Sequence, residues 1–202
     1  MDPHHWRRPG YWRLAVRIQT LPSKAALHHT NNFPSPIAHT WAMDITFRPA
    51  LAADTPFLTE MLAAAASWRP EGPTASIDTV SNTLALARYV SDWPQSGDLG
   101  VIAEIEEPIG AAWLRYFTDM DPSYGFIDAA TPELSMGVVA RCRSRGVGRR
   151  LLQVLLSAAR SQGIQAVSLS VDPDNYARQL YQGLGFESVC QPTSSITMRL
   201  QL

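Results

Sequence analysis

The sequence predicts an α/β domain, because strand and helix patterns alternate along its second half. Leu134 to Val139 has the composition of a strand, and Ala166 to Val171 has it again. Between them, apolar residues recur from Val147 to Ala158 at the spacing of one buried helix face, and Gly163 follows as a stop signal. This order of strand, turn, helix and strand is typical of the α/β class.

The first half of the predicted domain adds three strands and two helices. A strand begins at Ile45, and a helix follows after Asp54. A second helix is predicted from Ile77 to about Ser91. Two further strands, Leu99 to Ala103 and Ile109 to Phe117, are separated by a short turn, so we expect them to pair in antiparallel fashion.

Two segments complete the pattern. The polar stretch from Asp119 to Thr131 is either a solvated connection or a substrate lid, since loops of this length often have a function. The chain ends with alternating apolar residues between Ser194 and Leu202, which predict a C-terminal strand. The prediction is therefore a sheet with helices around it.

Composition excludes several classes of protein. A chain of 202 residues with a net charge of −1 is large enough for one domain, and it lacks the basic excess that nucleic-acid binding requires. No run reaches the roughly 18 to 20 apolar residues of a membrane span. Cys142 and Cys190 are too few for a disulfide framework and lack the spacing of a zinc site. We therefore expect a cytoplasmic protein with no metal and no nucleic-acid or membrane partner, present as a monomer or homodimer.

Residues 1–42 differ from the rest of the chain. They contain all five histidines, are rich in arginine and show no sustained helix or strand pattern. Three explanations stay open: a disordered or non-native extension before a start at Met43, a targeting peptide without a clear apolar core, or an arm for an acidic partner. We predict the first, with the domain at 43–202. Deletion of residues 1–42 should leave folding and activity intact, and an insoluble or inactive truncation would contradict this.

The turn before the predicted central helix is unusually basic. Arg145, Arg149 and Arg150 lie at the helix start, where the backbone dipole is already positive. Such cations are unfavourable there unless an anion is bound, and free backbone N–H groups at a helix start bind phosphate. Gly146 and Gly148 allow a close approach of the backbone. The turn therefore predicts a phosphate-binding site.

Two motifs identify the type of phosphate site. The only lysine is Lys24, so a P-loop is excluded, and a dinucleotide fingerprint fails because its third glycine position is Leu151. In contrast, Arg143 to Gly148 matches Arg/Gln-x-x-Gly-x-Gly/Ala, and Asn175 to Phe186 matches Asn-x-Ala-x-x-Leu-Tyr-x-x-x-Gly-Phe. In both motifs and their order, the chain resembles the GCN5-related N-acetyltransferase (GNAT) family. One departure is Ser144, where glycine is common.

The resemblance implies a fold, a cofactor and a binding site. The GNAT fold is a mixed, mostly antiparallel sheet of six to seven strands with about four helices, in which the strand after Glu133 splays away from the strand at Ala166 to Val171. Acetyl-CoA is the implied co-substrate, with its pantetheine arm in the gap and its pyrophosphate at the turn. The implied cofactor-binding residues are Met136, Gly137, Val138, Arg143, Ser144, Arg145, Gly146, Val147, Gly148, Arg149 and Asn175.

The implied reaction is acetyl transfer to a primary amine of a small molecule or peptide by direct attack in a ternary complex. Tyr181 occupies the family's general-acid position, although a half-buried packing role is the alternative. The amine must also lose a proton, and 43–202 contains no histidine or lysine to accept it. Glu133 is the expected base unless it is an ordinary surface residue, and Glu104 is second. A non-catalytic module that binds coenzyme A or acyl-CoA as a regulatory signal is the alternative function.

Overall fold

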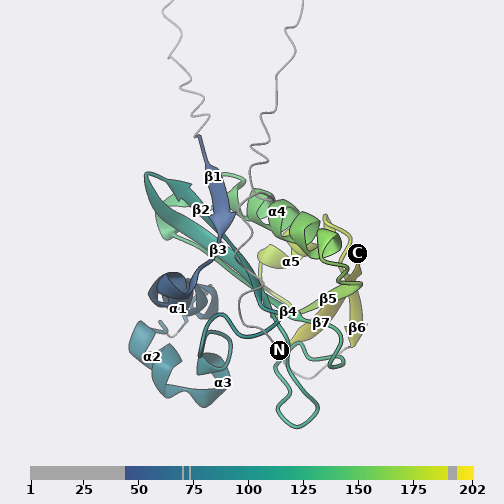
Figure 1. Cartoon of the computed structure of the whole chain (residues 1–202). Coiled ribbons are helices and arrows are strands. Elements are labelled where there is room, and N and C mark those ends of the chain that lie inside the picture. The colour runs from purple at the N-terminus through teal and green to yellow at the C-terminus, as the bar shows by residue number, and fades with distance from the viewer. Residues whose placement is uncertain (1–43, 70, 73, 191–194) are drawn as a thin grey trace, which may run out of the picture. The chain divides into compact units, whose positions relative to one another are not determined.

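In the computed structural model, residues 44–69, 71–72, 74–190 and 195–202 are described, and the predicted extension at 1–42 lies outside them. Residues Asp44–Leu202 form one compact unit. Its strands are β1 (Thr46–Pro49), β2 (Leu99–Ile105), β3 (Glu107–Arg115), β4 (Glu133–Val138), β5 (Ala166–Val171), β6 (Glu187–Cys190) and β7 (Ile196–Gln201). Its helices are α1 (Thr55–Ala66), α2 (Ile77–Asn82), α3 (Leu84–Ala87), α4 (Val147–Ser161) and α5 (Ala177–Gln182), with short 3-10 turns at Ala52–Asp54 and Ala140–Cys142 (Figure 1).

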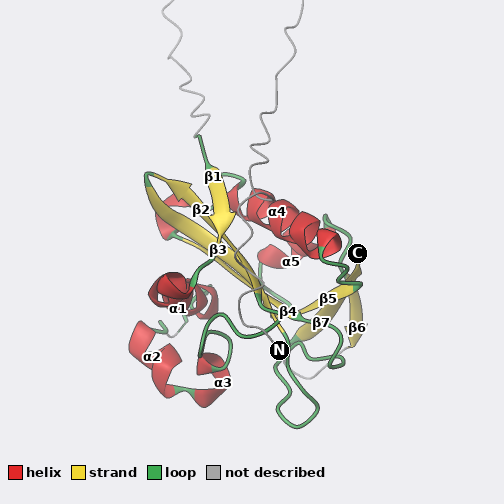
Figure 2. Cartoon of the chain, in the orientation of Figure 1, coloured by secondary structure: helices red, strands yellow, loops and turns green. Residues whose placement is uncertain are grey.

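The seven strands form one sheet in the order β1-β2-β3-β4-β5-β7-β6 (Figure 2). All neighbouring pairs are antiparallel except β4 and β5, which are parallel. The β2–β3 hairpin turns at Glu106, which has a positive φ of 62°, and the two strands pair as the sequence predicted. The fold is therefore the mixed, mostly antiparallel sheet that the resemblance implied.

The sheet opens between its two halves. The parallel pair has a single register position, Glu133↔Ser168, after which β4 and β5 diverge. In contrast, β3 pairs with β4 over six positions, and β5 pairs with β7 over six. The predicted splay is thus present at the centre of the sheet.

Helices α1 and α4 pack on opposite faces of the β2–β3–β4 half. Ala111 belongs to the buried cluster that contains Leu58 and Met61 of α1. A Cβ added to the neighbouring Gly110 would lie 3.0 Å from Leu151 of α4. Since successive residues of a strand point to opposite faces, these contacts place the two helices on opposite faces.

Two elements differ from the sequence-based expectation. The helix predicted from Ile77 to Ser91 is divided into α2 and α3, because Thr83 has an extended conformation (φ −103°, ψ 101°) between them. Strand β6 was not predicted, since Glu187–Cys190 has only four residues and gains its pairing from β7. None of the helices in the described ranges has the length and apolar character needed to cross a bilayer.

Candidate active site

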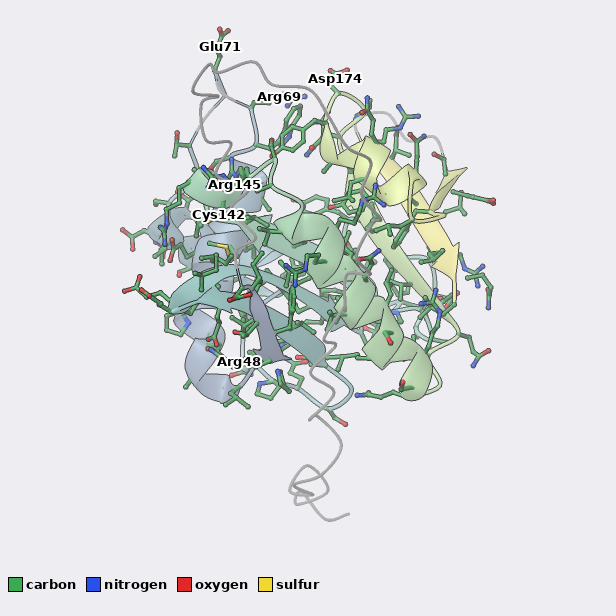
Figure 3. The ribbon with its side chains drawn as sticks, turned by 90° about the horizontal axis from the view of Figure 1, so that it is seen from above. Arg48, Arg69, Glu71, Cys142, Arg145 and Asp174 are labelled. Carbon is green, nitrogen blue, oxygen red and sulfur yellow. The ribbon has the colours of Figure 1, made fainter. Side chains whose placement is uncertain are left out.

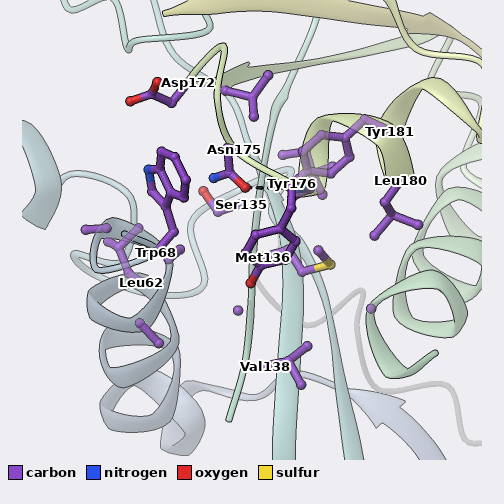
Figure 4. A pocket seen from close by; sticks show the side chains of 18 of the residues that line it. Leu62, Trp68, Ser135, Met136, Val138, Asp172, Asn175, Tyr176, Leu180 and Tyr181 are labelled. Atoms are coloured by element: carbon purple, nitrogen blue, oxygen red, sulfur yellow. Dashed lines mark hydrogen bonds between the residues drawn. The ribbon is translucent and has the colours of Figure 1, made fainter. Parts of the chain in front are cut away.

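A cavity of about 770 Å³ lies where β4 and β5 diverge. This volume is in the range of about 300 to 1,000 Å³ that is usual for small-molecule and cofactor pockets. Leu62 and Trp68 form one side, Met136 of β4 lies in the middle, and Leu180 and Tyr181 of α5 form the other side (Figure 4).

The middle of the cavity is an open strand edge. The Ser168 amide donates to the Pro132 carbonyl at 3.0 Å, so backbone groups of alternate residues from Pro132 onward face β5. Met136 is one of these residues, and β5 has diverged by that point. Within the described residues, its N–H and C=O therefore have no strand partner and face the cavity. This edge suits an extended ligand that forms hydrogen bonds with the strand backbone. The pantetheine arm of coenzyme A is such a ligand.

The basic turn forms the next wall. Gly146 has a positive φ of 81°, and a Cβ there would meet no atom of the described residues within 4 Å, so the backbone at this position can be approached closely. Ser144 also has a positive φ, 57°, which explains why glycine is common at this position. The N–H groups at the start of the 15-residue helix α4 point outward from this turn. The geometry therefore suits a phosphate group, and the residues present fit coenzyme A.

The arginines of the turn have different roles. Arg143 donates from Nε to the Val138 carbonyl at 2.9 Å, so its guanidinium joins the turn to β4. Arg150 lies over the Phe47 ring, with 5.1 Å between the guanidinium carbon and the ring centroid. Arg149 is exposed and lines the cavity. Arg145 is exposed beside the Cys142 turn and does not line the cavity (Figure 3).

Most of the predicted cofactor-binding residues lie together. Those that line the cavity are Met136, Gly137, Val138, Arg143, Ser144, Gly146, Gly148, Arg149 and Asn175. Arg145 and Val147 do not, and Val147 is buried beneath the turn. Gly137 has a packing role as well, because a Cβ there would lie 2.3 Å from the Met61 carbonyl oxygen of α1. Asn175 Oδ1 accepts a hydrogen bond from the Ala177 amide at 2.9 Å, at the start of α5.

Tyr181 is buried and lines the cavity. Its ring packs edge to face against Phe186, with 5.8 Å between the ring centroids. Burial, with a smaller contribution from Tyr176, raises the pKa of Tyr181 to about 12. The hydroxyl therefore keeps its proton at neutral pH.

Glu133 is not a surface residue: it is 3% exposed, lies at the start of β4 and lines the cavity. Its carboxylate accepts hydrogen bonds from the Tyr89 hydroxyl at 3.0 Å, from the Gly125 amide at 2.9 Å and from the Ser123 hydroxyl. Burial raises the pKa of Glu133 above its ordinary value, although these three hydrogen bonds oppose the rise. A carboxyl group with a raised pKa is a suitable proton acceptor near neutral pH.

Several cavity residues could not be found from the sequence. Tyr89 and Leu86 line the cavity together with Glu133 and with Tyr124 of the polar loop Asp119 to Thr131, and we call these four residues the Tyr89 wall. Asp172 also lines the cavity, and its carboxylate forms an ion pair of 2.8 Å with Arg69. No local pattern marks Tyr89, Leu86 or Asp172, because they come from loops and helix ends that only the fold brings together.

Other candidates lie elsewhere. Glu104 is paired with Arg48 at 2.7 Å on the β1–β2 edge and does not line the cavity. The acids Asp119, Asp121 and Asp128 of the polar loop do not line it either. In the described part of the chain, no three His, Cys, Asp or Glu side chains come together in a way that could hold a metal ion.

The family comparison agrees with this geometry. The family model described as "Acetyltransferase (GNAT) family" matches residues 62–186, which include the whole cavity-forming part of the sheet. The match defines the class of protein as an acetyltransferase. The chain belongs to the GNAT family. The search of curated proteins found no match.

Solved structures show the same fold. A ribosomal-protein-alanine N-acetyltransferase from Brucella melitensis is 25% identical with a TM-score of 0.54, covering 78% of this chain and 99% of that one. YncA from Salmonella typhimurium, solved with its cofactor acetyl-CoA, is 24% identical (TM-score 0.56; 79% and 94% covered). The PaiA N-acetyltransferase from Thermoplasma acidophilum, in complex with coenzyme A, is 19% identical (TM-score 0.56; 79% and 100% covered).

Proposed function

We propose that this protein transfers the acetyl group of acetyl-CoA to a primary amine of a small molecule or peptide, by direct attack in a ternary complex. The observation that carries the proposal is the cavity at the β4–β5 splay. It combines an open backbone edge at Met136, a basic helix start and two ionisable side chains, Tyr181 and Glu133, in one site. The Brucella relative, named for its action on a protein alanine, supports an amine acceptor.

The backbone of the chain holds and orients the co-substrate in this proposal. The amides of Ser144 to Arg149 bind the pyrophosphate at the start of α4, and Met136 to Val138 pair with the pantetheine arm. When bound, acetyl-CoA supplies the acetyl group as a thioester. The Met136 N–H lies on the open edge and can donate to an oxygen that gains negative charge during the reaction.

Tyr181 donates a hydrogen bond in this proposal, and Glu133 accepts a proton. With a pKa of about 12, Tyr181 keeps its proton and donates a hydrogen bond into the cavity, where a sulfur leaving group needs one. Complete proton transfer to a thiolate of pKa about 8.5 would be unfavourable, so hydrogen bonding is the expected contribution. Glu133 accepts the proton of the amine. Asp172 is less suitable for this because Arg69 already holds its carboxylate.

A panel of amines tests the proposal. Purified full-length protein is incubated with acetyl-CoA and small amines or peptides, and thiol release and product mass are measured. We expect at least one amine to be acetylated. In Tyr181→Phe, turnover should fall roughly tenfold or more while the melting shift caused by coenzyme A stays the same. Tyr116→Phe is the control, since Tyr116 is half-buried and does not line the cavity.

Two results would contradict the proposal. Unchanged turnover in Tyr181→Phe would remove Tyr181 from the mechanism. Binding of coenzyme A without acetylation of any amine in the panel would favour the non-catalytic binding module instead.

A further inference from the structure

We propose that Tyr89 is a positioning residue for the reaction: it orients the Glu133 carboxylate so that Oε1 is the atom that accepts the amine proton, and it fixes the backbone of Tyr124 in the same wall. The inference rests on the proposed function, and it deepens that function by assigning the proton-accepting atom. Tyr89 is not part of either family motif in this sequence.

The hydrogen bonds of Glu133 leave one position free. Among the residues that the structure describes, Oε2 accepts from both the Ser123 hydroxyl and the Gly125 amide, whereas Oε1 accepts only from the Tyr89 hydroxyl. A carboxylate has about four acceptor positions, two on each oxygen. The remaining position is therefore on Oε1, and Glu133 lines the cavity. An amine or a bridging water would bind at this atom.

The direction of the Tyr89 hydrogen bond is determined by its neighbours. The Tyr124 amide donates to the Tyr89 oxygen at 3.1 Å. A phenol has one proton, and the carboxylate of Glu133 can only accept when ionised, so the Tyr89 proton lies toward Oε1. Burial and the Glu133 charge raise the pKa of Tyr89 well above its usual range, so this proton is retained. The Tyr89 hydroxyl thus joins the Glu133 carboxylate to the backbone of Tyr124.

Side chains of strand β3 bind the backbone around Tyr89. Trp113 donates from its indole nitrogen to the Tyr89 carbonyl at 2.9 Å. Arg115 donates to the carbonyls of Arg88 and Ser91, each at 2.8 Å, on either side of Tyr89 in the sequence. Tyr89 itself is 4% exposed. The hydroxyl is therefore positioned by the folded core before any substrate binds, which is the property expected of a positioning residue.

In the described part of the chain, Tyr89 is the ionisable side chain that bonds Glu133, and the other groups around this carboxylate are mostly not ionisable near neutral pH. Its register partner on β3 is Arg115, whose guanidinium is bound to Asp98 at 2.5 Å. Its register partner on β5 is Ser168, and the loop contributes Ser123 and Gly125, none of which is ionisable near neutral pH. Loss of the Tyr89 hydroxyl removes a donor from the ionised carboxylate, so it should raise the pKa of Glu133 further.

The experiment compares full-length wild type, Tyr89→Phe and the control Tyr116→Phe. The carboxyl carbons of glutamate are labelled with ¹³C, and the Glu133 signal is assigned by its loss in Glu133→Gln. Without ligand, we expect the Glu133 titration midpoint to rise by about one pH unit in Tyr89→Phe and to stay unchanged in Tyr116→Phe. The acid limb of kcat/KM should move upward by the same amount, so activity lost at low pH returns at higher pH.

Two of the possible titration results would overturn the role of Tyr89. An unchanged Glu133 midpoint in Tyr89→Phe overturns the inference, and so does a moved midpoint with an unmoved acid limb. If the midpoint moves but wild type acetylates no amine, the proposed function fails while the coupling of Tyr89 to Glu133 stands. Amide exchange at Tyr124 is a second readout. It should become faster in Tyr89→Phe, and equal protection in both proteins would also overturn the inference.

Discussion

Replacement of Arg115 by methionine should destabilise the protein strongly, although Arg115 does not line the cavity. Arg115 is 1% exposed and its partner Asp98 is 6% exposed, with 2.5 Å between Nη2 and Oδ2. The same guanidinium binds the carbonyls of Arg88 and Ser91. Arg115→Met would leave a buried carboxylate without its cation and two carbonyls without this donor. Breaking a buried pair in this way costs about 3 to 5 kcal/mol.

That loss is a large part of the free energy of unfolding, which is about 5 to 15 kcal/mol for a typical domain. For a domain of this size, it corresponds to a fall in Tm of roughly 6 to 20 °C. Urea unfolding of wild type, Arg115→Met, Asp98→Asn and the double variant measures it. The double variant should lose less than the sum of the single losses, since no buried charge remains.

An exposed ion pair provides the control. The Arg69 side chain is 52% exposed in its pair with Asp172, so Arg69→Met should cost less than about 1 kcal/mol. If Arg115→Met lowered the free energy of unfolding as little as Arg69→Met, the Arg115–Asp98 pair would not stabilise the segment from Arg88 to Ser91. That result would refute the reasoning.

Three further predictions concern the cavity itself. Gly137→Ala places a Cβ 2.3 Å from the Met61 carbonyl oxygen and forces α1 away from β4, so urea unfolding should show a loss of about 1 to 3 kcal/mol; a neutral variant would be inconsistent with this packing. Arg143→Ala removes the donor to the Val138 carbonyl and loosens the turn, so calorimetry should show roughly fivefold weaker coenzyme A binding. An unchanged affinity would show that the turn keeps its conformation without Arg143. Because the pKa of Tyr181 is about 12, its ionisation should not lower kcat at any pH under about 10. A fall in kcat between neutral pH and pH 10 that is absent in Tyr181→Phe would disprove the assignment.

The central part of the fold was predictable from local patterns. The amphipathic repeat that begins at Val147 corresponds to α4, and Gly163, which has a positive φ of 77°, follows its end. The apolar segment Ala166–Val171 is β5 with the predicted bounds. Such segments have strong periodicity, and their neighbours do not change the outcome. Thr83 and β6 were missed because a single extended residue and a four-residue strand have no periodicity to detect.

Cavity residues were predictable where a motif encodes them or where the family resemblance marks their strand, as at Met136 to Val138. The turn at Arg143 to Gly148 and the Tyr181 helix have fixed spacing, and both line the cavity. The surroundings of Glu133 have no such spacing, since Tyr89 and Ser123 are 44 and 10 residues away from it in the sequence. Its burial and its hydrogen bonds follow from how the loop before β4 and the segment after α3 pack, which sequence patterns do not specify.

The most direct test of the central claim is a thermal melt of the full-length protein with and without acetyl-CoA, with NAD and ATP as controls. At a concentration near 100 times the dissociation constant, binding adds about 2.7 kcal/mol. We expect Tm to rise by roughly 5 to 10 °C with acetyl-CoA and not with the controls. A folded sample that shows no rise with acetyl-CoA would mean that the turn at Arg143 to Gly148 does not bind the cofactor, and the acetyltransferase function proposed for this site would be wrong.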